Sequence, residues 1–349
     1  LPNFRFLTRF RLRIILQNIP SYIIMVFGIM FAGLLLFFGL ALNPLLSNYK
    51  TEVVNNMICD YQYVLKAPVE TSNDAAEKFC MTTLYESNDE EISAYGIENG
   101  SEYLSKVNVP KKKNEVVASQ GYLEKYSLKV GDRVILKDKY GENKYTFKIV
   151  GSYYYPASLC VFMTNDNFND VFDKDDGYFT GYFSNEKLKD IDDKYIATTI
   201  TQKDLTTVTD QLDDSMGMSF TLLVGFSVLI YIILMYLLSK LVIEKNEQNI
   251  SMLKILGYSN REASMLYNRA TTVVTIGAIL VSVPFIYYVF AGLYHYFMFE
   301  MKGWLPYVVP WYVFVEMAVI GIICYAIIYF ILQKKINKIK LSQALKSDD

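Results

Sequence analysis

The chain has 349 residues, of which 52% are hydrophobic and 15% aromatic, and its formal net charge is −2. It contains a single histidine and no GxxxxGK[ST] sequence, so it offers neither a credible Ser/His/Asp or Cys/His triad nor a phosphate-binding P-loop. We therefore expect no enzyme activity of its own, no cofactor and no metal site. Soluble proteins average about 45–50% apolar residues, so the distribution of these residues decides more than their total.

Four apolar runs approach the length of about 20 residues that a helix needs to cross a bilayer. They are Ile19–Leu42, Phe220–Ile243, Ala270–Tyr294 and Val308–Leu332. The first run is too long for a cleaved signal peptide, and no A-x-A sequence follows it. The basic and aromatic residues before it favour either a helix on the inner membrane surface or a simple topological anchor. We predict a membrane α-helical protein with four transmembrane helices.

Small residues in the first run predict close packing against another span, because they let helices approach each other in lipid. These residues are Gly28, Ala32, Gly33 and Gly39. Pro44 should end or kink this helix. Beyond it, Tyr49, Val53 and Met57 keep a helical period, which indicates a stalk that leaves the membrane.

Charged residues are strongly segregated along the chain. Between Leu46 and Met218 the sequence has 29 acidic and 19 basic residues, whereas the remainder has 7 acidic and 15 basic ones. The positive-inside rule then places both termini and Glu244–Tyr267 in the cytoplasm, and Leu46–Met218 outside it. The negative charge of this outer region argues against nucleic acid as a partner.

The outer region has the pattern of a mixed α+β domain of about 130 residues, inserted between the first two transmembrane helices. Lys111–Phe172 is its clearest unit, with strand patterns such as Glu115–Ser119 and short helical turns between them. Tyr61–Leu65 predicts another strand, and Ala75–Leu84 fits either a helix or a strand. Leu205–Met218 is predicted to be a second stalk, continuous with the second transmembrane helix.

The cysteines and one acidic cluster allow two interpretations each. A Cys59–Cys80 disulfide is possible outside the cell, but buried thiols are favoured because three outer cysteines cannot all pair. Asp173–Gly177 is acidic, but it lacks the alternating spacing of an EF-hand loop, which favours a solvated turn over a calcium site.

Glu244–Tyr267, between the second and third apolar runs, predicts a helix, a glycine stop and a newly capped helix. We expect the helix that starts near Phe220 to continue through Leu256. Gly257 should end it, because only glycine adopts the left-handed C-cap conformation without penalty. Ser259 and Glu262 then have the spacing of a capping box.

The first helix of this corner is predicted to be amphipathic. Ile250, Leu253 and Leu256 should form one apolar face, with Met252 beside it. The opposite face carries Glu247, Ser251 and Lys254. A sharp corner that is charged and partly apolar suits docking on a partner, and the alternative is an ordinary loop between two membrane helices.

The third and fourth spans contain few polar groups. His295 lies among aromatic residues at the outer end of the third span, which is typical of an interfacial aromatic belt. Glu316 lies about a turn and a half into the fourth span and is a candidate intramembrane polar site. Its shallow depth also fits the headgroup region of the bilayer.

Three motifs, taken with this topology, resemble the FtsX-like (MacB-type) ABC transporter permeases. ISMLKILGYSNRE (Ile250–Glu262) resembles the family's sequence between its second and third spans. Glu115–Thr164 resembles its external domain, and INKIKLSQALK (Ile336–Lys346) its C-terminal tail. Members of the family often have Glu immediately before the residue that matches Ile250, where this chain has Asn249. The Arg-rich beginning without Met is similar to the C-terminal half of long, ten-span members.

The resemblance implies a multi-pass protein of the cell membrane that works with a separate ABC ATPase and with a second permease chain or half. It implies that 1–45 forms the lead-in and first helix, 46–204 the extracytoplasmic domain, and 205–243 the second stalk and helix. By the same resemblance, 244–268 is the coupling segment and 269–349 the last two helices and the basic tail. The residues implied to couple to the ATPase are Glu247, Ile250, Leu253, Lys254, Leu256, Gly257, Ser259 and Glu262.

Two functions are consistent with these features. The first is an ABC permease subunit or half that uses ATP hydrolysis by its partner to move the outer domain, for export or mechanotransmission. The second is a membrane-anchored sensor or adaptor whose outer domain binds a ligand without any ATPase. An ATPase bound to the corner would distinguish the two.

Overall fold

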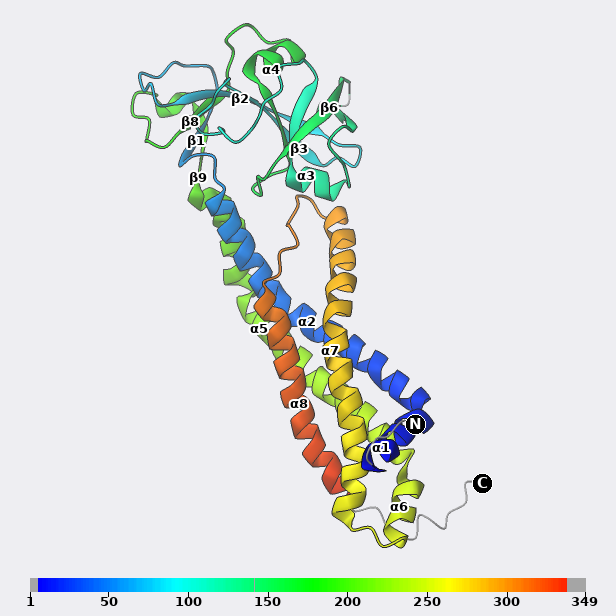
Figure 1. Ribbon diagram of the computed structural model, residues 1–349. Helices are drawn as coiled ribbons and strands as arrows, with labels where there is room; N and C mark the ends of the chain where they lie inside the picture. The colour runs from blue at the N-terminus through cyan, green and yellow to red at the C-terminus, as the bar shows by residue number, and fades with distance from the viewer. Residues whose placement is uncertain (1–5, 141, 338–349) are drawn as a thin grey trace. The chain divides into compact units, whose positions relative to one another are not determined.

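The chain is described by a computed structural model that covers residues 6–140 and 142–337. It divides into two compact units (Figure 1). One unit comprises Leu1–Pro44, Met216–Gly292 and Val309–Asp349, and the other comprises Leu45–Ser215 and Leu293–Val308. Three of the chain's helices contribute residues to both units.

Long helices form the first unit. The helices that contribute to it are α1 (Phe6–Gln17), α2 (Ile19–Asn55), α5 (Gln202–Glu244), α6 (Glu247–Ile255), α7 (Asn260–Glu300) and α8 (Trp311–Asn337). Four of them, α2, α5, α7 and α8, are long and apolar enough to cross a membrane. The four predicted spans are therefore confirmed. The motif in the C-terminal tail beyond Asn337 lies outside the described residues.

The small residues of α2 provide its contacts with neighbouring helices. A Cβ atom on Gly28 would lie 2.4 Å from Leu238 Cδ1, and one on Gly39 would lie 2.7 Å from Ser227 Oγ. Both neighbours belong to α5, so larger side chains would push these two helices apart. This confirms the predicted packing face. The helix does not end at Pro44 but continues to Asn55, as the helical period beyond the proline indicated.

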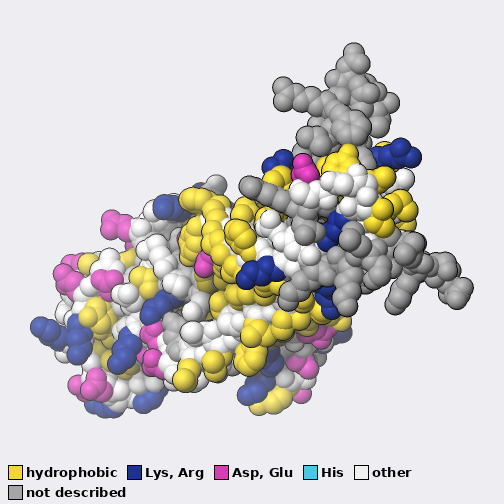
Figure 2. Space-filling view, turned by 90° about the horizontal axis from the view of Figure 1, so that it is seen from below, with side chains coloured by type: hydrophobic (Ala, Val, Ile, Leu, Met, Phe, Trp, Pro, Cys, Tyr) yellow, Lys and Arg dark blue, Asp and Glu magenta, His cyan; other side chains and the backbone are white. Residues whose placement is uncertain are grey.

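Apolar side chains on the outer faces of the spans remain exposed, as a lipid environment requires. Phe226, Leu229 and Ile233 of α5 expose 63%, 53% and 47% of their surface. Hydrophobic side chains cover much of the face of the molecule seen in Figure 2. A soluble protein would not expose so large an apolar surface, so the chain is a multi-pass membrane protein.

The second unit is built around a nine-stranded sheet with the strand order β3-β7-β4-β6-β5-β2-β8-β1-β9. The strands are β1 (Tyr61–Leu65), β2 (Glu77–Tyr85), β3 (Glu91–Ile97), β4 (Glu115–Ser119), β5 (Arg133–Lys137), β6 (Lys144–Tyr153), β7 (Cys160–Thr164), β8 (Gly181–Ser184) and β9 (Ile196–Thr201). Two short helices accompany them, α3 (Gln120–Lys125) and α4 (Asn165–Val171), with a 3₁₀ turn at Asp193–Tyr195. This unit is the α+β domain predicted between the first two spans.

The long strand β2 joins two parts of this sheet. From Phe79 to Tyr85 it pairs with β3, and from Glu77 to Phe79 it pairs with β8. The ladder that leaves β3 through β7, β4, β6 and β5 returns to β2 at the pair Tyr85–Lys137. Six strands therefore close into a ring, and β8, β1 and β9 extend from it.

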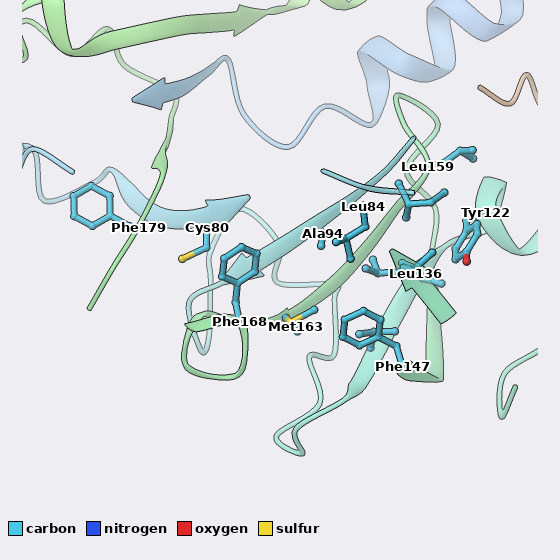
Figure 3. Packing of buried hydrophobic residues seen from close by; sticks show 14 of the residues in the cluster. Cys80, Leu84, Ala94, Tyr122, Leu136, Phe147, Leu159, Met163, Phe168 and Phe179 are labelled. Atoms are coloured by element: carbon cyan, nitrogen blue, oxygen red, sulfur yellow. The ribbon is translucent and has the colours of Figure 1, made fainter. Parts of the chain in front are cut away.

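Alternate residues of the strands point to two separate apolar clusters, as the period of a strand requires. One cluster contains Cys80, Leu84, Phe147 and Phe168, whose packing is shown in Figure 3. The other contains Cys59, Tyr95 and Phe162. Cys59 and Cys80 thus belong to different clusters, and all four cysteines are free and buried. The possible disulfide is not formed, and the alternative of buried thiols is confirmed.

Candidate functional site

The corner between the second and third spans consists of two helices where one was expected. Helix α5 ends at Glu244, and α6 begins at Glu247. The expectation of an unbroken helix to Leu256 was therefore wrong. The Asn246 side chain donates to the Val242 carbonyl oxygen at 2.7 Å and to Asn18 Oδ1 at 3.0 Å. Asparagine competes in this way with the helical hydrogen bonds, which accounts for the break.

The glycine stop predicted at the end of α6 is confirmed. Gly257 has a φ of 95°, in the left-handed region. The Tyr258 N–H donates to the Leu253 carbonyl and the Gly257 N–H to the Lys254 carbonyl, both at 3.2 Å. These are the two hydrogen bonds of a Schellman motif.

The capping box at the start of α7 is also confirmed. The Glu262 N–H donates to Ser259 Oγ at 3.3 Å, and the Ser259 N–H donates back to Glu262 Oε2 at 2.9 Å. Donation by the Ser259 N–H and hydroxyl lowers the pKa of Glu262. The turn between α6 and α7 is thus fixed at both ends, and it presents a rigid corner.

The structure corrects the predicted apolar face of α6. Ile250 is 0% exposed and Ser251 is buried, so this side of the helix packs against its own chain. Lys254, expected to face away, is half-buried and donates to the Ile336 carbonyl of α8 at 2.9 Å. Partial burial lowers the pKa of Lys254. Of the three residues of the predicted face, only Leu256 is strongly exposed. An apolar helix face can pack against its own chain as well as against a partner, and the sequence pattern is the same in both cases.

Among the exposed apolar side chains of the corner are Met252, Ile255 and Leu256, which expose 49%, 54% and 70% of their surface, and Tyr258, which exposes 40%. Ile255 was not among the predicted residues. Its signal was present in the sequence, since it follows Met252 at the i+3 spacing of a helix face. Leu253 and Glu247 are half-buried. The exposed apolar face of α6 is therefore rotated from the predicted one.

A cavity of about 390 Å³ lies beside this face, between α1, α6 and the start of α7. Its lining combines two exposed cations, Arg13 and Lys245, with amides and apolar side chains. The other lining residues are Ile14, Gln17, Asn18, Asn246, Asn249, Met252, Leu253, Leu256 and Tyr267. Asn249, which stands where the family often has Glu, is among them.

The corner is tied to the C-terminal end of α8 by charged side chains. Glu244, the last residue of α5, accepts from Lys335 Nζ at 2.5 Å and lies 3.5 Å from Lys240 Nζ. Together with the bond from Lys254 to Ile336, this ion pair connects α5, α6 and α8. A force applied to the corner would therefore reach several helices at once.

The candidate intramembrane acid does not belong to this site. Glu316 is exposed on α8, whereas Val313 and Met317 on the same helix are buried. Its carboxylate thus points away from the packed face of the helix. The eight predicted coupling residues lie together between Glu247 and Glu262, and Glu316 lies apart from them on α8.

Four helices able to cross a membrane, with an α+β domain between the first and second, fit a multi-pass membrane protein. Residues 221–341 match the family described as FtsX-like permease C-terminal. Over these 121 of the 349 residues the chain is similar to the FtsX-like permeases, as its motifs indicated. No curated protein matches the chain in a direct comparison.

The matched family is one of ABC transporter permeases, which supports that role for this chain. Its members are membrane subunits of ABC systems, which include an ATPase partner and a dimeric permease, and they are generally not catalytic themselves. The matched residues include α6, α7 and α8 and most of α5. The sheet domain lies outside the match.

Proposed function

We propose that this chain is a permease subunit, or half of one, that couples ATP hydrolysis by a separate ATPase to movement of the sheet domain. The observation that supports this most directly is the rigid corner at 245–262, which presents Met252, Ile255 and Leu256 beside two cations. Exposed apolar side chains on a fixed, polar-rimmed turn have the composition of a protein interface. In this proposal the ATPase binds there.

The second requirement is a stiff connection from the corner to the sheet domain. Helix α5 has 43 residues and starts directly after β9, so it spans about 65 Å without a linker. The Asp204 carboxylate accepts two hydrogen bonds from Thr201, one from the backbone N–H at 2.8 Å and one from the side-chain hydroxyl at 2.6 Å. The junction of strand and helix is thereby fixed, and rotation of α5 would turn the edge of the sheet.

The two stalks are joined to each other as well. Lys50 of α2 forms an ion pair with Asp210 of α5, and Asp210 also accepts from the Thr206 hydroxyl at 3.2 Å. These contacts let the stalks move together. The side chains of Val208, Leu212 and Met216, which suggested the second stalk, lie outside the described residues.

The charge segregation supports an orientation with both termini and the corner in the cytoplasm and the sheet domain outside. Work done by the ATPase would then be delivered to the outer side of the membrane, for export or for mechanotransmission to an outer partner. A second permease chain or half would complete the assembly, as in the family.

The test is the substitution Leu256→Asp in the full chain. Leu256 is 70% exposed, so the change should leave folding intact while it places a charge in the proposed apolar interface. We expect the ATP hydrolysis that co-purifies with the chain to fall about tenfold or more, as for an interface hot spot. The matched control is Val130→Asp, which alters a 56% exposed residue of the sheet domain and should change nothing.

Undiminished hydrolysis with Leu256→Asp would contradict the docking assignment. If the wild-type chain brings no ATPase with it from its native membrane, a sensor or adaptor without ATPase becomes the better function.

A further inference from the structure

The segment between α7 and α8 is bonded to the sheet domain through a buried cation. Lys125, the last residue of α3, donates to the carbonyl oxygens of Met301 at 2.7 Å and of Gly303 at 2.9 Å. Its third partner is Glu90, whose Oε2 lies 2.8 Å from Nζ. The ammonium group has three N–H donors, and all three have partners.

Both charged side chains of this pair are buried. The side chain of Lys125 is 0% exposed and that of Glu90 is 7% exposed. The second oxygen of Glu90 accepts from the Gly303 N–H at 2.6 Å. The Gly303 N–H thus donates to Glu90, and the Gly303 C=O accepts from Lys125. The φ of Gly303 is 78°, a backbone conformation that favours glycine. Removing one member would leave a buried charge unpaired, which is costly.

Trp304 adds an aromatic anchor beside this pair. Its indole N–H donates to Glu124 Oε2 at 3.0 Å, and its ring packs on the main apolar cluster of the domain. A Cβ atom on Gly121 would lie 3.0 Å from Trp304 Cδ1, so the glycine leaves space for the ring. We call Glu90, Lys125 and Met301–Trp304 the clasp.

The end of α7 is part of the same packed structure. The Tyr294 hydroxyl donates to the Leu305 carbonyl at 3.0 Å, and the His295 ring lies 5.3 Å from that of Trp304. Phe299 meets Tyr126, the residue after α3, in an edge-to-face contact at 5.7 Å. The outer end of α7 is therefore held to the sheet domain by side chains as well as by the clasp.

Helix α7 is continuous over 41 residues, which is about 60 Å, and includes Pro284, where one helical hydrogen bond is lost. It begins at Asn260, next to the Ser259 cap of the corner, and ends at Glu300, one residue before the clasp. We propose that the clasp makes α7 a second transmission rod, which carries movement of the corner to the α3 side of the sheet domain while α5 carries it to β9. This inference rests on the proposed function of the corner.

The decisive test interrupts α7 with a flexible insertion and leaves the residues of the clasp unchanged. Three glycines are inserted between Gly292 and Leu293, ahead of every contact described above between α7 and the sheet domain, in the full chain purified with its ATPase. The readout is the ATP-dependent change in distance between spin labels placed by Tyr140→Cys and Trp311→Cys. We expect the insertion to reduce this change by about half or more, because a flexible segment transmits no torque.

The matched control inserts the same three glycines between Val308 and Val309, on the α8 side of the clasp, and should leave the change as in the wild type. If the insertion after Gly292 also leaves the change intact, the clasp is purely structural and the proposal is wrong. Loss of ATPase co-purification in the wild type would instead overturn the function proposed for the corner, so the two failures are distinguishable.

A second measurement tests the clasp itself without any ATPase. In Lys125→Met, amide hydrogen exchange at 301–304 should become about tenfold faster or more, while β4 and β6 keep their protection. The control Lys194→Met removes a cation that is 65% exposed and pairs with Asp192, and it should alter neither region. Rapid exchange of the Gly303 amide in the wild-type chain would overturn the clasp directly.

Discussion

Gly181 illustrates how one residue can determine the pairing of three strands. It lies on β8, between β1 and β2, and a Cβ atom there would approach the Tyr63 carbonyl oxygen to 1.9 Å. The same atom would lie 2.8 Å from the Phe79 ring. Backbone cannot yield to such a contact as a flexible side chain can, so β8 would have to separate from β1.

We therefore expect Gly181→Ala to destabilise the sheet domain by more than about 2 kcal/mol, as overpacking against backbone does. The measurement is thermal denaturation of the full chain in detergent, followed by the protease resistance of the sheet domain. Gly151→Ala is the control, because its new Cβ would meet Val117 Cγ2 at 3.4 Å, an ordinary contact. Equal stability of the two variants would contradict this argument.

Residue-level prediction succeeded where chemistry is local and failed where it depends on packing. The conformations of Gly257 and Ser259 follow from their own neighbours in sequence, and both were predicted correctly. Ile250 was assigned to an outward face, but it is fully buried. Periodicity identifies the apolar side of a helix, yet it does not tell whether that side contacts a partner or the protein's own core.

The same limit applies to whole elements. Strand β1 was predicted with its observed ends, whereas β9 was missed, because this short strand at the sheet edge is defined by its pairing with β1. Ala75–Leu84 fitted a helix or a strand, and its pairing with β3 decides for the strand. The clasp was not predicted either, since Met301 lies more than 170 residues after Lys125 in sequence.

Between elements, a single carboxylate holds the acidic segment after β8 to the segment before β2. Asp190 accepts from the Ser72 N–H at 2.6 Å and from the hydroxyls of Ser72 at 2.9 Å and Thr71 at 3.0 Å. These donors, the Ser72 N–H first, lower the pKa of Asp190 to about 2. Leu188 and Ile191 on either side are buried in the core, so the segment is anchored rather than merely solvated.

This pKa predicts how the stability of the attachment varies with pH. The unfolded value is about 3.9 and the folded value is lower, so the stabilisation is complete above pH ~4 and is lost as the pH falls towards 2. We expect Asp190→Asn to lower the melting temperature at pH 7, and the difference from the wild type to shrink below pH ~4. Asp74→Asn, which alters an exposed carboxylate near Ser72, should match the wild type throughout. A difference that does not depend on pH would exclude this ionic explanation.

For the whole molecule, the central question is which side of the membrane each unit faces, and its charge distribution makes a definite prediction. The segment Leu46–Met218 has a net charge of −10 and the rest of the chain +8. Basic segments stay on the cytoplasmic side during insertion, so the corner should be inside and the sheet domain outside. The proposed function depends on this orientation, because an ATPase can reach the corner only from the cytoplasm.

The native cysteines make the test simple. All four are buried, and burial raises the pKa of Cys59, Cys80 and Cys160 to about 12, so their thiolates are scarce. A membrane-impermeant maleimide should therefore leave the wild-type chain unlabelled in intact cells. It should label Tyr140→Cys, at a position 83% exposed on the sheet domain, and should label Leu256→Cys only after permeabilisation. The reverse pattern would place the corner outside, where no ATP is available, and would rule out coupling to an ATPase through this site.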